Sequence, residues 1–277
     1  MGQSSIQKQE IPLWPEGAPI DRQRKKTEKS SAKITIYPSG GPRDTAIIIC
    51  PGGGYGGLVT GAEGHGIARW LNRHDVTGVV LEYRLPRGRS FVPLHDAQRA
   101  VRLLRSEAGN LKLDRSRIGI LGFSAGGHLA GSAAVHSDAG NRLAKDPVEK
   151  YSCRPDFAIL VYPVVSMELP VTHAGSRRNL LGSNPTAELV EHFSIEKQVS
   201  NRTPPLFLAH AQDDRPVPPK NSQLLFAAAG KQKILAEYLK LPTGGHGLNG
   251  YKGPSWDRWQ RESLAWMKNL PQKKPVP

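Results

Sequence analysis

Three residue types that together can form an activated nucleophile occur in a fixed order along this chain. The first is Ser124, at the centre of the sequence GFSAG, which fits the pattern G-x-S-x-G. An apolar run that predicts a strand precedes it, and a run of small residues that predicts a helix follows it. A serine on such a turn has strained backbone angles and needs small neighbours, and its hydroxyl is exposed above a sheet. We therefore expect Ser124 to be a nucleophile.

A serine hydroxyl becomes a good nucleophile when a base takes its proton and an acid orients that base. His246 lies in the sequence GGHG, immediately after a predicted strand, so it is the expected base. Asp213 and Asp214 follow another predicted strand, and their positions alone leave both open as the acid. The other aspartate is expected to hydrogen-bond within its loop. His128 lies inside the helix predicted after Ser124, where we expect it to pack or hydrogen-bond.

The glycine-rich sequence CPGGGYGG, residues 50–57, must let a reacting group or ligand approach its backbone closely. It fits a loop that offers backbone N–H groups to an oxyanion. It also fits G-x-G-x-x-G of a dinucleotide site, with Glu82 as the ribose-binding acid. That second interpretation needs a helix that starts inside the loop, whereas further glycines up to Gly66 delay the helix. It also leaves the order Ser, Asp, His unexplained, so we favour the oxyanion loop and expect Glu82 to pair with Arg84 or another cation.

The elements that must position these residues alternate between strands and helices. Strands are expected at 33–37, as an edge strand, and at 46–50, 78–83, 118–122, 157–162, 206–210 and 234–241, and helices at 66–74, 93–109, 125–136, 219–229 and 256–270. This alternation predicts an α/β fold with a mostly parallel central sheet and helices on both faces. We expect an N-terminal arm at 1–32 and one catalytic domain at 33–277, with an insertion at 163–203 near the active site.

Composition limits the classes of partner and cofactor. The formal net charge is +14 over 277 residues, but no basic motif is interleaved with aromatic residues, so a soluble basic surface is favoured over nucleic-acid binding. Attraction to acidic polysaccharide is the intermediate alternative. No apolar run approaches the roughly 18 residues of a membrane span, so no membrane partner is expected. No apolar leader segment is present, so the prediction is a cytoplasmic protein, or a periplasmic or secreted one if a signal peptide was removed.

Cysteine and histidine spacing gives no reason to expect a metal. The two cysteines, Cys50 and Cys153, are far apart and form no C-x-x-C motif, and the histidines lack H-E-x-x-H spacing. Cys50, at the end of an apolar strand, is expected to be a small buried hydrophobic residue. We predict that no metal or cofactor is required.

Taken together, these motifs resemble those of α/β-hydrolase esterases, within the bacterial feruloyl-esterase-like and acetyl-xylan-esterase-like branch. The sequences that carry the resemblance are PGGGY at 51–55, GFSAGGHLA at 122–130, HAQDD at 210–214 with Val217-Pro218, and GGHG at 244–247. IPLWPEGAP at 11–19 and GSRRNLLG at 175–182 also match, so the resemblance covers nearly the whole chain. One departure is Pro51, where many related enzymes carry a histidine.

The resemblance implies an α/β-hydrolase fold and a serine esterase with a Ser-His-Asp triad and an acyl-enzyme. In this branch the acid lies four residues after the histidine that ends its strand, which points to Asp214. The oxyanion donors would be the N–H groups of Gly53, Gly54 and Ala125. The substrates implied are short acyl esters, acetyl and then feruloyl, on oligosaccharide or polysaccharide, or small-molecule esters.

Several alternatives stay open at this point. Tyr55, beside the oxyanion loop, is expected to bind substrate by stacking on a sugar ring, and Tyr251 or Trp256 could do the same, although each could simply pack. The insertion at 163–203 is expected to shape the acyl or sugar side of the pocket. A general short-chain carboxylesterase without carbohydrate preference is the alternative function, followed by a peptidase or an inactive binding module. The oligomeric state is not predicted.

Overall fold

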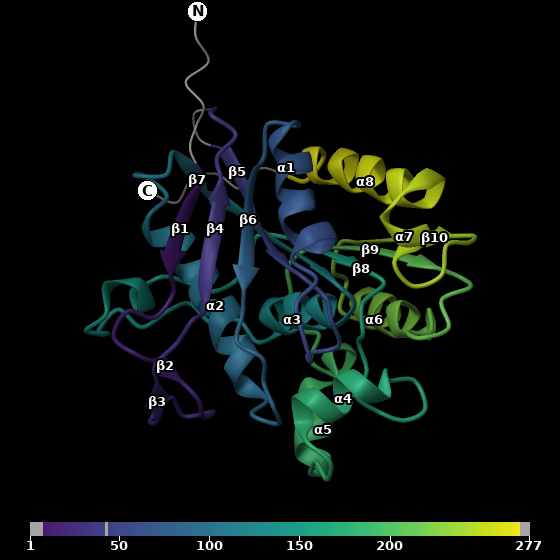
Figure 1. The fold of residues 1–277 in the computed structure, drawn as a ribbon, viewed down its shortest axis with the longest axis horizontal. Helices are drawn as coiled ribbons and strands as arrows, with labels where there is room; N and C mark the ends of the chain where they lie inside the picture. Colours follow the sequence, from purple (N-terminus) through teal and green to yellow (C-terminus); the bar gives the residue numbers. More distant parts are fainter. Residues whose placement is uncertain (1–7, 42–43, 272–277) are drawn as a thin grey trace, which may run out of the picture.

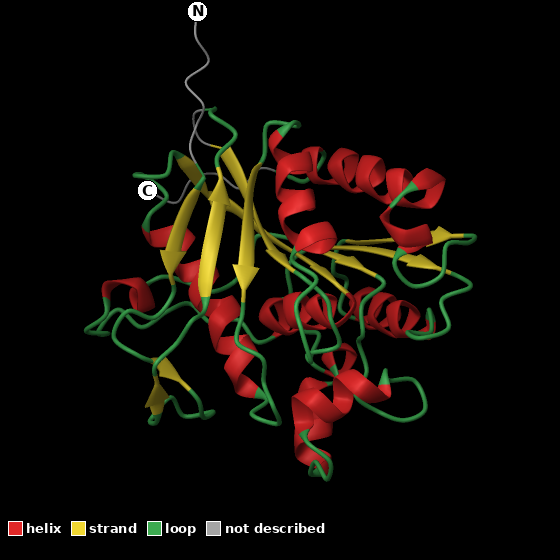
Figure 2. Ribbon diagram, viewed as in Figure 1, coloured by secondary structure: helices red, strands yellow, loops and turns green. Residues whose placement is uncertain are grey.

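Apolar strands such as AIII at 46–49 form the centre of the molecule in a computed structural model that describes residues 8–41 and 44–271. The strands form one large sheet, which Figures 1 and 2 show between two layers of helices. In spatial order its strands are β1 (Gln9–Pro12), β4 (Lys33–Tyr37), β6 (Thr77–Glu82), β5 (Asp44–Cys50), β7 (Leu113–Phe123), β8 (Ala158–Val161), β9 (Leu206–Ala211) and β10 (Ala236–Leu241).

The sheet is parallel over most of its width. From β6 through β5, β7, β8 and β9 to β10, all neighbouring strands pair in parallel, whereas β1, β4 and β6 pair antiparallel. Parallel neighbours bring their carboxyl ends to the same edge of the sheet. The loops after β5, β7, β9 and β10 are therefore placed together, and the expected mostly parallel sheet is confirmed.

Alternate residues of the central strands pack against the two helix layers, as the period of two in a strand requires. Ile48 of β5 packs in a core with residues of α2, α3 and α6, whereas Ile47 and Ile49 pack in a second core with residues of α1 and α8. The two layers consist of α2 (Phe91–Ser106), α3 (Ser124–Val135) and α6 (Lys220–Lys231) on one face, and α1 (Gly66–Asn72) and α8 (Gly253–Lys268) on the other.

The prediction that 33–37 is an edge strand is wrong. Ile34, Thr35 and Ile36 of β4 are all buried, because β1 pairs with β4 on its outer side. The sequence of β1, QEIP, is short, mostly polar and ends in proline, so it carries no alternating signal. Sequence periodicity misses a strand of this kind, because β1 forms through its pairing with β4 and not through an apolar pattern of its own.

The predicted N-terminal arm contains this edge strand and a small ribbon of β2 (Ala18–Pro19) and β3 (Thr27–Glu28). The arm is tied to the domain through Trp14, whose Nε1 donates to Asp96 at 2.6 Å and whose ring lies under the guanidinium of Arg99. Residues 1–7 of the predicted arm lie outside the described residues.

The predicted insertion at 163–203 contains two helices that project from the α3 side of the sheet. These are α4 (Ala174–Leu181) and α5 (Ala187–Phe193), followed by a short 3-10 turn, η3 (Ile195–Lys197). The remaining short elements are the π-helical turn η1 (Gly61–His65), the 3-10 turn η2 (Pro147–Lys150) and the irregular turn α7 (Leu248–Tyr251). The strand-helix alternation breaks within 163–203, where α4 packs onto the glycine loop after β5 and α5 packs against α2 and α3.

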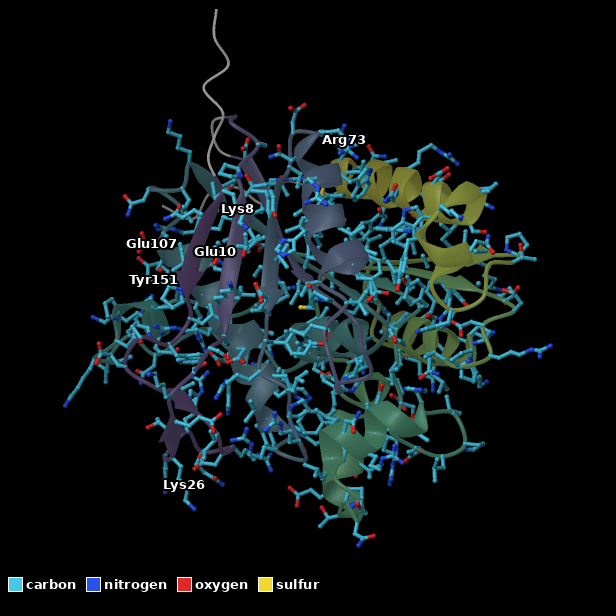
Figure 3. All side chains as sticks on the ribbon, in the orientation of Figure 1. Lys8, Glu10, Lys26, Arg73, Glu107 and Tyr151 are labelled. Carbon is cyan, nitrogen blue, oxygen red and sulfur yellow. The ribbon has the colours of Figure 1, made fainter. Side chains whose placement is uncertain are left out.

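Charged side chains are spread around the molecule. Figure 3 labels Lys26 and Arg73 at opposite ends of the view. Lys8, just before β1, forms an ion pair with Glu10 of β1 at 3.2 Å. Glu82 pairs with Lys33 at 3.5 Å, so the cation expected beside it is Lys33 and not Arg84. Over 8–41 and 44–271, no helix has both the length and the apolar character needed to cross a membrane.

Candidate active site

Ser124 lies on a sharp turn between β7 and α3. Its backbone φ is +54°, a left-handed value that is uncommon for a residue with a side chain. The turn requires glycine on both sides, because a Cβ at Gly122 would overlap the carbonyl of Gly126, and one at Gly126 would overlap the carbonyls of Cys50 and Pro51. The G-x-S-x-G pattern is therefore a packing requirement of this turn.

The side chains of Ser124, His246 and Asp214 form one hydrogen-bonded line. The Oγ of Ser124 lies 2.9 Å from His246 Nε2, and His246 Nδ1 lies 2.8 Å from Asp214 Oδ2. The three residues follow β7, β10 and β9, whose carboxyl ends share one edge of the sheet. This arrangement can move a proton from the serine hydroxyl to the imidazole while the carboxylate stabilises the charged ring.

The two neighbouring aspartates have different partners. Asp214 is 3 % exposed, bonds to His246 and also accepts from the backbone N–H of Val217. Burial acts to raise the pKa of Asp214, but the hydrogen bonds from His210 and His246 outweigh it and lower that pKa to about 2. Asp213 instead accepts from the N–H groups of the glycines at 244 and 245, at 3.2 and 2.9 Å. Asp213 thus orders the neighbouring loop that carries His246, whereas the sequence predicted hydrogen bonds within its own loop.

The glycine loop after β5 passes close to the nucleophile, since a Cβ on Gly52 would lie 3.1 Å from the Cβ of Ser124. Gly53 and Gly54 have φ values of +125° and +63°, and the carbonyl of Gly53 accepts from the N–H groups at 56 and 57. Within the described residues, no oxygen accepts a hydrogen bond from the N–H of Gly53 or Gly54. Consecutive free N–H groups in such a conformation form an anion-binding concavity.

The third expected oxyanion donor, Ala125, is the second residue of α3 and is fully buried. The first N–H groups of a helix have no partner within the helix. They also lie at the positive end of the helix dipole, which favours a negative charge nearby. The positions of Gly53, Gly54 and Ala125 therefore suit an oxyanion beside Ser124.

The expectation that Tyr55 stacks on a sugar ring is corrected by the structure. Tyr55 is 2 % exposed; its ring packs edge-on against Tyr83 and its hydroxyl lies 2.8 Å from His128 Nδ1. The ring and its polar tip are thus used inside the protein. His128 is completely buried, and burial lowers its pKa to about 4. It packs within the helix, as expected.

The other two aromatic candidates pack against aromatic neighbours. Trp256 is 7 % exposed and stacks on Phe123 of β7, and Tyr251 packs edge-on against Trp256. Both line a cavity of about 410 Å³ between α1 and α8. Trp256 is thus largely covered by its neighbours, whereas Tyr251 is half-buried.

The sequence assigned no role to three residues near the site. Glu63, in η1, accepts a hydrogen bond from Gly52 N–H at 2.7 Å. Asn179, in α4, donates to the carbonyl of Gly54 at 2.9 Å, so the insertion contacts the glycine loop directly. His173 lies at the N-terminus of α4, close to Gly54, and burial and the charge of His246 lower its pKa. The sequence gives no signal for these contacts, because each depends on packing between distant segments, so only the fold reveals them.

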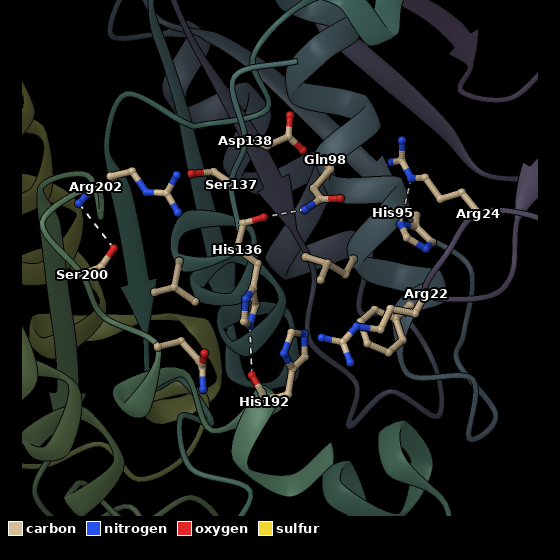
Figure 4. Close-up of a pocket in the computed structure, with 14 residues that line it drawn as sticks. Arg22, Arg24, His95, Gln98, His136, Ser137, Asp138, His192, Ser200 and Arg202 are labelled. Carbon is tan, nitrogen blue, oxygen red and sulfur yellow. Dashed lines mark hydrogen bonds between the residues drawn. The ribbon is translucent and has the colours of Figure 1, made fainter. Parts of the chain in front are cut away.

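A cavity of about 570 Å³ elsewhere on the protein is separate from this site. Figure 4 shows it around His136 and His192, with Arg22 and Arg24 on one side. His136 follows the C-terminus of α3, roughly 18 Å along the helix axis from Ser124. The two arginines are already paired with Glu188 and Glu149. This cavity therefore plays no part in the chemistry of Ser124.

The described residues contain no group of three or more His, Cys, Asp or Glu side chains arranged to hold a metal ion. Both cysteines are free and buried, and burial raises the pKa of Cys50 well above its usual range. Cys50 is thus the small buried residue that its position predicts. The reactive groups available at the site are the serine hydroxyl, the imidazole and the carboxylate.

A family model and a solved structure both match this chain over most of its length. A model of the BD-FAE family matches residues 36–228, a span that includes the glycine loop, Ser124 and Asp214. The solved acetyl ester-xyloside bifunctional hydrolase from Caldicellulosiruptor lactoaceticus has a TM-score of 0.87 and 37% identity, with 94% of this chain and 95% of that chain covered.

Two curated relatives are longer than this chain. An acetylxylan esterase from Xylanibacter ruminicola is 32% identical over 256 residues, which cover 88% of this chain and 50% of that protein. An endo-1,4-beta-xylanase B from Butyrivibrio fibrisolvens is 40% identical over 225 residues, which cover 78% of this chain and 34% of that protein. The chain thus spans about half of one relative and a third of the other.

Proposed function

The chain belongs to the BD-FAE family and has an α/β-hydrolase fold, and from that premise we propose that it is a serine esterase that removes short acyl groups, acetyl foremost, from carbohydrate. The observation that carries this proposal is the hydrogen-bonded line of Ser124, His246 and Asp214. The free N–H groups of Gly53 and Gly54 beside it supply the second requirement of acyl transfer, a site for the oxyanion.

In the first half of the reaction, the Oγ of Ser124 attacks the ester carbonyl carbon. His246 Nε2 takes the hydroxyl proton as the new C–O bond forms, and Asp214 stabilises the resulting imidazolium. The carbonyl π electrons move onto oxygen, and the N–H groups of Gly53, Gly54 and Ala125 hold that charge. Each such donor is worth roughly 3 kcal/mol of transition-state stabilisation in other enzymes. The imidazolium then protonates the leaving alkoxide, which departs as an alcohol and leaves an acyl-serine.

In the second half, water takes the place of the leaving alcohol. His246 removes a proton from the water as its oxygen attacks the acyl carbonyl, and the same N–H groups hold the second oxyanion. Collapse of this intermediate breaks the bond to Ser124 Oγ, which recovers its proton from His246. The products are a carboxylic acid and the free enzyme, and the atoms and protons balance with water as the second substrate.

The names of the relatives support carbohydrate as the substrate class. One is an acetylxylan esterase, and another is an acetyl ester-xyloside bifunctional hydrolase. We assign the acyl side of the site to the segment around α4, because Asn179 and His173 of that segment lie against the glycine loop. A small acyl group such as acetyl suits a loop that a helix covers this closely, and feruloyl is the second candidate.

The test of the chemistry compares wild type with Ser124→Ala on p-nitrophenyl acetate. The variant keeps the shape of the site but lacks the nucleophile, so kcat should fall by about 10⁴-fold or more. Turnover near the wild-type value would refute the assignment of Ser124.

The test of the substrate compares initial rates on acetylated xylan, methyl ferulate and p-nitrophenyl butyrate. A higher kcat/KM for acetylated xylan supports the carbohydrate esterase. A preference for butyrate or longer chains, with no activity on xylan, would favour a general short-chain carboxylesterase instead.

A further inference from the structure

We propose that Glu63 is a positioning residue that holds the oxyanion loop and the general base in register with Ser124, an inference that rests on the proposed esterase function. Glu63 lies at the centre of the π-helical turn η1 and is only 4 % exposed. π-Helical turns are rare and frequently mark functional sites. A buried carboxyl group is costly unless its oxygens are satisfied, and here each oxygen is committed to a different part of the site.

One oxygen of Glu63 fixes the glycine loop. Oε2 accepts from the N–H of Gly52 at 2.7 Å, and the carbonyl of Gly52 accepts from Val59 N–H at 3.0 Å. Gly52 is therefore held on both sides, immediately before the two free N–H groups at 53 and 54. The packing is close, since a Cβ on Gly52 would lie 2.5 Å from Glu63 Oε2 and 3.1 Å from the Cβ of Ser124.

The other oxygen of Glu63 reaches the general base through a tyrosine. The hydroxyl of Tyr162 donates to Oε1 of Glu63 at 2.9 Å. The centroid of the Tyr162 ring lies 4.8 Å from the centroid of the His246 ring. The hydroxyl of Tyr251, from the irregular turn that follows the His246 loop, also acts to lower the pKa of Glu63. Both oxygens act as acceptors, which is the arrangement of an ionised carboxylate. Burial raises the pKa of Glu63, and these donors and the charge of His246 oppose that rise.

The contact between Glu63 and Gly52 should matter for the transition state and not for the bound ester. Oxyanion donors must lie within about 2.7–3.1 Å of the position that the charged oxygen will occupy. A displacement of about 1 Å at such a group can lower the rate by 10²-fold. Loss of the Glu63 anchor should therefore weaken binding of the tetrahedral intermediate while ground-state binding of the ester stays the same. A residue that merely contributed to folding would not separate these two effects.

The test uses Glu63→Gln and Glu63→Ala, with Glu82→Gln as the control. The glutamine variant keeps the size of the side chain and an acceptor for Gly52, whereas the alanine variant leaves Gly52 unanchored. Glu82 is a half-buried carboxylate on β6 that pairs with Lys33 on β4, away from the triad. Each protein is titrated to end-point with a fluorophosphonate, so that kcat for p-nitrophenyl acetate is expressed per reactive serine. Inhibition by phenylboronic acid, which forms a tetrahedral adduct with serine, is measured in parallel.

For Glu63→Ala we expect a fall in kcat of about 10²-fold, with KM within about threefold of wild type and a matching loss of affinity for phenylboronic acid. Glu63→Gln should lose about tenfold in both quantities, and Glu82→Gln should match wild type. If Glu63→Ala does not fold, Glu63→Gln decides the question by itself. Turnover of Glu63→Gln within about twofold of wild type, or a fall in kcat with unchanged affinity for phenylboronic acid, would overturn the proposal. A wild-type protein that neither reacts with the fluorophosphonate nor hydrolyses the ester would instead refute the esterase function itself.

Discussion

His246 Nε2 lies 2.9 Å from the Oγ of Ser124, although 122 residues separate them in the sequence. The contact follows from the topology of the sheet. Ser124 follows β7 and His246 follows β10, and the parallel pairing through β8 and β9 puts both carboxyl ends on one edge. The ligand crevice of an open α/β sheet lies outside this edge. The predictions below depend on this arrangement.

The adjacent aspartates should differ sharply in their effect on the reaction. Asp214→Asn removes the carboxylate that holds the His246 tautomer, so kcat/KM should fall by about 10⁴-fold. Asp213→Asn disturbs only two backbone hydrogen bonds to the loop, so the loss should stay below about tenfold. Steady-state kinetics on p-nitrophenyl acetate checks both variants, and equal losses in the two would contradict the assignment of Asp214.

Asp214 should also contribute to stability in a defined pH window. Its folded-state pKa is about 2, below the ordinary value of 3.8, so the stabilisation is present at neutral pH. It is lost as the pH falls from about 4 toward 2, and its full size is about 2 kcal/mol. Urea unfolding of wild type and Asp214→Asn at a series of pH values measures this. The difference in unfolding free energy between them should shrink on acidification, and a constant difference would speak against it.

Two helical glycines should respond in opposite directions to alanine. Gly126→Ala puts a methyl group against the carbonyls of Cys50 and Pro51, so the free energy of unfolding should fall by about 3 kcal/mol and activity should be lost. Gly230→Ala, in α6, meets no atom within 4 Å and should stabilise by about 0.5–1 kcal/mol. Denaturant unfolding of both variants is the check. A tolerated Gly126→Ala would mean that the turn at Ser124 is less tight than described.

The strand-helix alternation predicts most of the fold, because buried parallel strands such as 46–50 are apolar throughout and stand out from the helices between them. The edge strand β1 is missed because its four residues carry no pattern and depend on β4 for their hydrogen bonds. Tyr55 is misassigned for a related reason: its position beside the loop is correct, but the direction of its side chain depends on His128 and Tyr83.

In the site, too, some residues can be predicted from the local sequence, whereas others depend on tertiary contacts. Ser124 and His246 can be predicted because glycines lie close to each of them, and a sharp turn imposes that requirement locally. Glu63 cannot be predicted in this way, because the sequence AEGHG at 62–66 resembles any polar segment. Its burial and its contact with Gly52 arise only when η1 packs against the loop after β5. Sequence patterns thus identify the groups that we propose to react, and the fold is needed to identify the groups that we propose to hold them.

The central claim, an acyl-enzyme on Ser124, is tested most directly by trapping that intermediate. The protein is mixed with p-nitrophenyl acetate, quenched in acid within the first turnover, digested and analysed by mass spectrometry. We predict one acetyl group on the peptide that contains Ser124, absent from Ser124→Ala and formed at the rate of the p-nitrophenol burst. Acetylation confined to another residue, or rapid turnover with no acetyl group on that peptide, would contradict the mechanism.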